Sequence, residues 1–107
     1  MSLASRLRAR IALERPETTP DDIGGASRAW TSEGEAWAEI IAGGAGEAAG
    51  LDGPSARTTY RVSIRMRRDV LPGWRLRWGA RTLRVRTIAD GDAQGALLML
   101  ECEEEFL

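Results

Sequence analysis

The sequence predicts a mainly β fold, a small antiparallel β-barrel or β-sandwich of about six strands. Apolar and polar residues alternate with a period of two in several segments, most clearly over Thr59–Arg67. These segments are short and are separated by turns rich in glycine and proline. A chain of 107 residues is also the right length for one domain with one modest core. We therefore treat residues 1–107 as a single β-domain.

The first expected strand covers residues 6–14, where Ile11 and Leu13 lie in the same phase as Leu7. We expect Pro16 to end this strand, because proline cannot donate a hydrogen bond to a ladder. The residues that follow, 16–29, are turn-rich.

Two features are expected between residues 27 and 56. A strand is predicted around Ala36–Ala42, with a short strand or bend before it at Ser27–Thr31. Residues 42–56 contain five glycines and one proline, with few large side chains. A loop of this length in a compact domain is usually functional or disordered, so we expect a flexible loop there.

The second half of the chain predicts three more strands after Thr59–Arg67. They cover residues 74–78, 81–89 and 96–103, with turns at Pro72-Gly73, Gly79-Ala80 and Asp90–Asp92 between them. Ile88 is out of phase with its strand, which predicts a β-bulge. The last strand is apolar on both faces and is expected to be central, and residues 104–107 are expected to form a tail.

The inward phases of these strands define the expected core. It comprises Leu7, Ile11, Leu13, Val62, Ile64, Leu76, Leu83, Val85, Leu98 and Leu100. Cys102 is expected to be a small buried hydrophobe. All four tryptophans (Trp30, Trp37, Trp74 and Trp78) are assigned to the core, with Trp74 the most open to partial exposure because it starts a strand after a turn.

Composition excludes several classes of function. The chain has no histidine and a single cysteine, which rules out an internal disulfide, a Cys/His zinc site and any His-dependent catalytic triad. No apolar run approaches the roughly 18 residues that span a bilayer, and Arg6, Arg8 and Arg10 interrupt any signal-peptide core. We expect no enzyme, catalytic residue, cofactor, metal or membrane contact, and a chain made in the cytosol.

Charge is distributed in three blocks. Residues 1–53 carry a net charge of −4, and residues 90–107 carry −6. Residues 54–89 hold ten arginines and one acid, a net charge of +9. A chain of this kind can attract other copies or a charged partner, although the fold can also interleave the segments into one mixed surface.

The arginines of the basic block alternate with the core residues. On paired strands they would form one guanidinium surface, made of Arg61, Arg65, Arg75, Arg77, Arg84 and Arg86. Three interpretations stay open: a subunit or partner interface, a face that binds nucleic-acid phosphates, or a solvated sheet face. For an interface, the acidic counterparts would be Glu101, Glu103, Glu104 and Asp21. Stacking aromatics would favour nucleic acid, but Tyr60, Trp74 and Trp78 fall on the opposite face.

The ordered motifs carry a family resemblance. They are LRARIALERP at 7–16, DDIGG at 21–25, Trp30, WAEI at 37–40, YRVSIRMRRDVLPGWRL at 60–76, a Gly-x-Arg hairpin at 79–81 and LLMLECEE at 97–104. In this order the chain resembles the phage head–tail joining family, the head-closure (stopper) and adaptor proteins of siphovirus-type necks. A prophage or a gene transfer agent is a source that would suit it.

The resemblance implies a structural virion protein of the particle neck, assembled in the bacterial cytoplasm. Its β-barrel would dock on the portal or adaptor as a ring, dodecameric in the particle, close the DNA channel and connect the capsid to the tail. The implied partners are the portal or adaptor ring, tail-terminator or tail proteins and other copies of the chain, with packaged DNA passing through non-specifically. The implied docking or channel loop holds Gly43, Gly44, Gly46, Glu47, Gly50 and Leu51. The alternative function is a small β-barrel nucleic-acid-binding module that uses the arginine-rich face.

Overall fold

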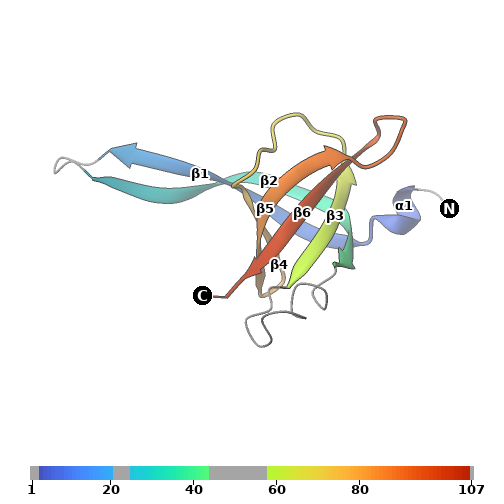
Figure 1. Cartoon of the computed structure of the whole chain (residues 1–107), viewed down its shortest axis with the longest axis horizontal. Helices are drawn as coiled ribbons and strands as arrows, with labels where there is room; N and C mark the ends of the chain where they lie inside the picture. Colours follow the sequence, from blue (N-terminus) through green and yellow to red (C-terminus); the bar gives the residue numbers. More distant parts are fainter. Residues whose placement is uncertain (1–2, 21–24, 44–57, 107) are drawn as a thin grey trace, which may run out of the picture.

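The computed structural model of the chain describes residues 3–20, 25–43 and 58–106. These residues form a four-residue helix and six strands (Figure 1). The elements are α1 (Leu3–Arg6), β1 (Ala9–Pro20), β2 (Ala26–Ala42), β3 (Thr59–Arg65), β4 (Arg75–Trp78), β5 (Arg81–Asp90) and β6 (Leu97–Glu105).

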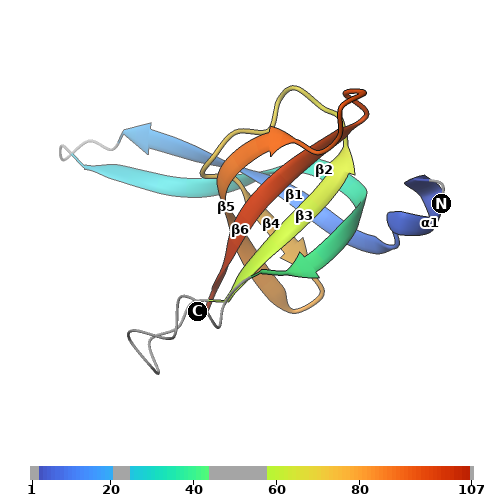
Figure 2. The same cartoon turned by 45° about the vertical axis from the view of Figure 1, so that its right-hand side comes forward.

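The six strands form a closed antiparallel barrel in the order β1-β2-β3-β6-β5-β4. Figure 2 shows the strands wrapping around one interior, with α1 at one end. The predicted mainly β fold and the predicted barrel are therefore confirmed. Closure removes the free edges of the barrel wall, which would otherwise invite pairing with other chains.

Three residue pairs between β1 and β4 close the barrel. Ala12 pairs with Arg77, Leu13 with Leu76, and Glu14 with Arg75. Leu13 and Leu76 are fully buried, so the seam is held by core packing on the inner side. On the outer side, the Glu14 carboxylate accepts a hydrogen bond from Arg75 and forms an ion pair with it.

A two-stranded arm extends from the barrel, which the sequence did not predict. Beyond the seam, Glu14–Pro20 of β1 pairs with Ala26–Ser32 of β2 (Figure 1); we call this pair the hairpin arm. The expectation that Pro16 ends the first strand is wrong. β1 pairs with β4 only as far as Glu14. After Glu14, one edge of β1 has no neighbouring strand, so a proline nitrogen that faces this edge costs no hydrogen bond between strands. Of the short strand or bend expected at Ser27–Thr31, the structure has the strand, which is part of the continuous strand β2.

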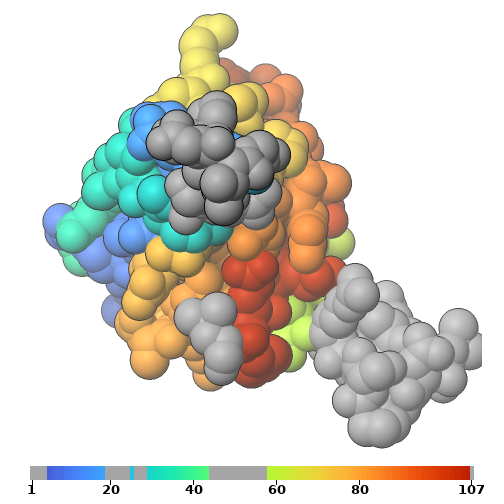
Figure 3. Space-filling model, turned by 90° about the vertical axis from the view of Figure 1, so that its left-hand side faces the viewer, coloured from blue at the N-terminus to red at the C-terminus, as the bar shows by residue number. Residues whose placement is uncertain are grey.

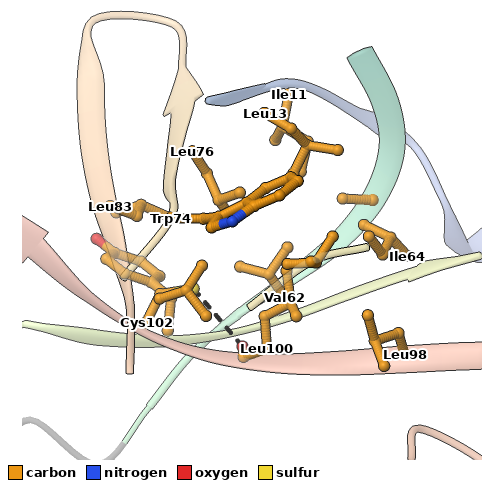
Figure 4. Close-up of a cluster of buried hydrophobic side chains, with 14 residues drawn as sticks. Ile11, Leu13, Val62, Ile64, Trp74, Leu76, Leu83, Leu98, Leu100 and Cys102 are labelled. Atoms are coloured by element: carbon orange, nitrogen blue, oxygen red, sulfur yellow. Dashed lines mark hydrogen bonds between the residues drawn. The ribbon is translucent and has the colours of Figure 1, made fainter. Parts of the chain in front are cut away.

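The core is the one that the alternation predicted. All ten expected residues are buried, and most of them join Trp74, Val70, Tyr60 and Cys102 in one cluster (Figure 4). Trp74 lies in the middle of the labelled side chains and is only 3% exposed. Backbone hydrogen bonds on either side of it, from Gly73 N to Val85 O and from Val85 N to Trp74 O, hold it against β5. The possible partial exposure of Trp74 is therefore not realised.

Two other expectations concern β5 and β6. The β5–β6 register shifts between Val85 and Thr87, which confirms the bulge that the phase of Ile88 predicted. β6 lies between β3 and β5, but every strand of a closed barrel has two neighbours, so the expected central position does not distinguish it. β6 continues to Glu105 rather than ending at residue 103.

Trp37 is a correction to the predicted core, because it is 51% exposed. On β2 the inward positions are held by Ala36, Ala38 and Ile40, which pack on or within the core. Trp37 lies in the opposite phase, with Glu39. The small alanines leave room for the neighbouring strands, and the large indole is placed outside.

Trp30 joins the hairpin arm to the barrel. It is half-buried on β2, opposite Pro16. The guanidinium carbons of Arg75 and Arg84 lie over its ring, 4.3 and 4.9 Å from the centroid. Arg75 and Arg84 are direct cross-strand neighbours, so their like charges oppose pairing. The electron-rich face of the indole offsets this repulsion and fixes the base of the arm.

The first prediction concerns the thiol of Cys102. It is 2% exposed, and burial, with a smaller effect of the Glu101 charge, raises its pKa from 9.0 to about 12. Native protein at pH 8 should therefore react with a thiol reagent only as fast as it unfolds, whereas protein in urea should react at once. Between about pH 9 and 12 the unfolded chain loses this proton first, so stability should fall with rising pH, and less so in Cys102→Ala. Rapid labelling of the native protein would contradict the burial.

The second prediction concerns the joint at Trp30. Trp30→Ala should lower the free energy of unfolding by about 2 kcal/mol, because two cation–π contacts are lost and two arginines face each other without the ring. Urea denaturation measures this, and hydrogen exchange should be faster for the arm amides. Trp37→Ala is the matched control, since it removes an exposed indole with a single arginine contact. It should lower the free energy of unfolding by less than Trp30→Ala does. Equal stability of Trp30→Ala and the parent would show that the joint contributes nothing.

Candidate interaction surface

The arginines of the basic block do not form one surface. Arg61 and Arg65 are on β3, and Arg84 and Arg86 are on β5, with β6 between the two strands. Figure 3 shows β6 (red) with β3 (yellow-green) on one side and the orange strands on the other. The outward side chains of β6 include glutamates, so an acidic row separates the arginines of β3 from those of β5 and its neighbour β4. The expected single guanidinium face is thus not present, because the chain order of the strands differs from their order in the barrel.

Three of the six arginines are occupied within the chain. Arg75 pairs with Glu14, Arg84 with Glu105 at 3.1 Å, and Arg86 with Glu103 at 2.9 Å. The Arg75 and Arg84 side chains are about one-fifth exposed or less and also cover Trp30. Their first role is therefore to hold the seam and the arm.

The other three arginines point outward. Arg61, Arg65 and Arg77 are exposed, and none of them forms an ion pair with another described residue. Arg61 lies opposite Glu101 in the β3–β6 register. Arg77 is on β4, on the side of the barrel away from β3. These three side chains remain available for a partner.

The predicted acidic counterparts are also divided. Glu103 is bound to Arg86, whereas Glu101 is exposed. Glu104 accepts a hydrogen bond of 3.4 Å from the Tyr60 hydroxyl, which in turn accepts one of 3.0 Å from Arg81. Asp21 lies outside the described residues.

Most of the predicted loop site cannot be placed. Gly44, Gly46, Glu47, Gly50 and Leu51 lie outside the described residues, as does most of the loop 42–56. Gly43 is described, and its backbone N–H donates to the carbonyl of Thr59 at 2.7 Å. A Cβ on Gly43 would come within 2.5 Å of the Thr59 hydroxyl oxygen, so the chain requires glycine at this point for β2 and β3 to approach.

An exposed apolar patch was missed by the sequence analysis. Trp37 stands between two surface hollows of about 360 and 310 Å³, and Arg65 borders both. The guanidinium of Arg10 lies over the indole, 5.1 Å from its centroid. We call this surface the Trp37 patch; it consists of Leu7, Arg8, Arg10, Trp37, Arg65 and Met66. The signal was in the sequence, because Trp37 shares its phase with Glu35 and Glu39 rather than with Ala36 and Ala38.

Ion pairs stabilise the borders of this patch. Arg6 donates to Glu39 at 2.8 Å, and this hydrogen bond lowers the pKa of the Glu39 carboxyl. Arg67 binds both oxygens of Asp69, which lowers the pKa of Asp69 in the same way. Both carboxylates therefore stay ionised to lower pH than usual, and they are engaged by arginines rather than available to a partner.

The parts of the chain that the structure describes contain no group of acidic, cysteine or histidine side chains able to hold a metal ion. Among the same residues, no helix has the length and apolarity needed to cross a membrane.

Comparisons with known proteins agree with this fold. The family model described as phage head completion protein matches residues 3–105. A chain in the virion of a native gene transfer agent particle is 32% identical with a TM-score of 0.77, covering 94% of this chain and 96% of that one. A protein of Shigella flexneri 2a with a known solution structure is 27% identical with a TM-score of 0.70, covering 92% and 93%. No curated protein sequence matches the chain.

The family match spans nearly the whole barrel, from α1 to the end of β6. The outward arginines and the Trp37 patch fit a protein that works through contacts with other proteins, and the family is one of structural particle proteins. The chain belongs to the phage head completion protein family, and it is a structural protein of the head–tail neck of a phage or phage-like particle.

Proposed function

We propose that the chain docks as a ring on the portal or its adaptor, closes the DNA channel and connects the capsid to the tail. The observation that carries the proposal is the likeness, over 94% of the chain, to a component of an assembled gene transfer agent virion. A protein that shares its fold from end to end with a virion component is suited to the same kind of assembly.

The barrel wall supports docking through two sides. Arg61 and Arg77 are exposed on β3 and β4, which lie on opposite sides of the barrel. A subunit between the portal or adaptor and the tail needs two different surfaces, one for each of these partners. Arginine suits such contacts, since its planar group binds carboxylates through two hydrogen bonds. We propose tail-terminator or tail proteins as the partners on the far side of the ring.

The nucleic-acid-binding alternative has less support. A face that tracks a phosphate backbone needs closely spaced cations without intervening acids. Here Glu101 and Glu103 on β6 separate the arginine rows of β3 and β5. Passage of DNA through a closed ring requires no specific contact, so it is compatible with this wall.

Charge reversal on the wall tests the docking role. Arg77→Glu should leave the thermal midpoint of unfolding nearly unchanged, because this exposed group makes no ion pair with the described residues. Arg61→Glu should lower the midpoint only slightly, because it places a second glutamate opposite the exposed Glu101. The test uses particles whose own copy of the chain is deleted and replaced by the variant. Each variant should produce filled heads without tails. The number of joined particles, counted by electron microscopy, should be a tenth or less of the number formed with the parent chain.

Arg68→Glu is the matched control for these variants. It makes the same change of charge at an exposed position in the β3–β4 connection and should join heads to tails normally. Normal joining by Arg61→Glu and by Arg77→Glu would show that the arginines are only a solvated surface.

Self-association of the isolated chain should be weak. Exposed ion pairs contribute about 0–1 kcal/mol each, and association costs several kcal/mol in lost freedom of motion. A neighbour already fixed on the portal raises the effective concentration and offsets that cost. We predict that the pure protein at about 0.1 mM and moderate salt sediments as an 11.7-kDa monomer. A stable large ring in that experiment would contradict assembly on a template.

A further inference from the structure

Four large apolar side chains among the described residues are strongly exposed, and two of them lie at opposite ends of the barrel. Trp37 is 51% exposed beside α1, and Phe106 is 77% exposed just after β6. The other two are Ile41 and Leu71. Aromatic residues, methionine and arginine are enriched at the centres of protein interfaces.

We propose that the Trp37 patch of one copy binds Phe106 and the acidic end of β6 of a second copy, so that copies associate head to tail. The acidic end of β6 is defined as Glu101–Phe106. This inference rests on the proposed ring, and it names the surfaces through which neighbouring copies meet.

The shape of the patch suits an aromatic side chain. Leu7, Arg8 and Arg65 line the hollow of about 360 Å³ on one side of Trp37. The hollow of about 310 Å³ is lined by Ala36, Met66, Arg65, Arg67 and Glu35, and the Glu35 carboxylate is already paired with Arg10. An aromatic ring placed in either hollow would contact the indole. Ring pairs of this kind stabilise an interface beyond the area that they bury.

The charges of the two surfaces are complementary. Arg8 and Arg65 are exposed at the rim and form no ion pair with any described residue. At the end of β6, Glu104 lies two residues before Phe106, and its carboxylate is hydrogen-bonded to the neutral hydroxyl of Tyr60 rather than to an arginine of the described chain. An arginine beside Trp37 can therefore meet a carboxylate beside Phe106 without breaking an existing ion pair.

The placement of the surfaces excludes contact within one copy. Arg10 and Arg65 locate the patch at the α1 end of the barrel, whereas the end of β6 lies far from α1 in both Figure 1 and Figure 2. A surface at one end that fits a different surface at the other end produces a heterologous contact, which continues from copy to copy and closes as a ring when the rotation between copies divides a full turn.

Two complementary variants test a single contact. Isotope-labelled Phe106→Ala keeps the Trp37 patch, and unlabelled Trp37→Ala keeps Phe106. A mixture of the two variants can therefore form a heterodimer through one contact, but neither variant can add further copies. As unlabelled protein is added to about 1 mM, we expect the Trp37 indole N–H and the amides of β2 and β3 near Arg65 to shift, and the arm amides to stay fixed. Added salt should reduce the shifts.

The controls use the same labelled protein. Unlabelled Phe106→Ala should cause no shift. Unlabelled protein carrying both Trp37→Ala and Leu71→Ala should act like Trp37→Ala, because Leu71 is also strongly exposed but takes no part in the contact. If Trp37→Ala does not fold, Arg65→Glu replaces it as the copy without a working patch.

Three results would overturn the inference. They are the absence of shifts up to that concentration, shifts caused equally by unlabelled Phe106→Ala, and shifts at the patch caused by random duplex DNA instead of protein. The last result would assign the patch to nucleic acid. Normal head–tail joining by Trp37→Ala particles would also reject this contact, while tail loss in Arg61→Glu would still support the proposed function.

Discussion

The short seam between β1 and β4 is the contact on which the rest of the structure depends. Only three residue pairs close the barrel, yet they bring together the buried pair Leu13 and Leu76 and the ion pair of Glu14 with Arg75. If the seam opened, the wall would become an open sheet with two long edges and a split core. The same arginine also lies over Trp30, so the seam fixes the hairpin arm as well as the barrel.

Closure also decides which charges are used for stability. The seam and the neighbouring strands engage Arg75 and Arg84 with carboxylates and with the Trp30 ring. Exposed arginines without such partners lie elsewhere, on β3 and β4. The barrel therefore separates an internal network that holds the fold from outer groups that are free to contact other proteins, which suits a protein whose work is assembly.

Membership of the phage head completion family gives this division a purpose. A neck protein must be stable before assembly and must meet several partners without forming filaments in solution. A rigid closed barrel meets the first requirement, because it has no open edges in its wall. The contacts that we propose, through a few arginines and one half-exposed tryptophan, would meet the second, because each is weak until a neighbour is already in place.

The sequence by itself determined the fold class, the core and the bulge near Ile88, because these depend on alternation along one strand at a time. The tertiary structure alone decided what depends on the order of strands in space. It separated the arginine rows by placing β6 between β3 and β5, and it allowed β1 to continue past Pro16 at an unpaired edge. The exposure of Trp37 falls between these two cases. The sequence contains the strand phase of Trp37, but the hydrophobicity of tryptophan favoured an assignment to the core. In the structure, the neighbouring Ala38 pairs with Ile64, and both side chains are buried in a filled interior. Trp37, one residue earlier on β2, therefore points outward.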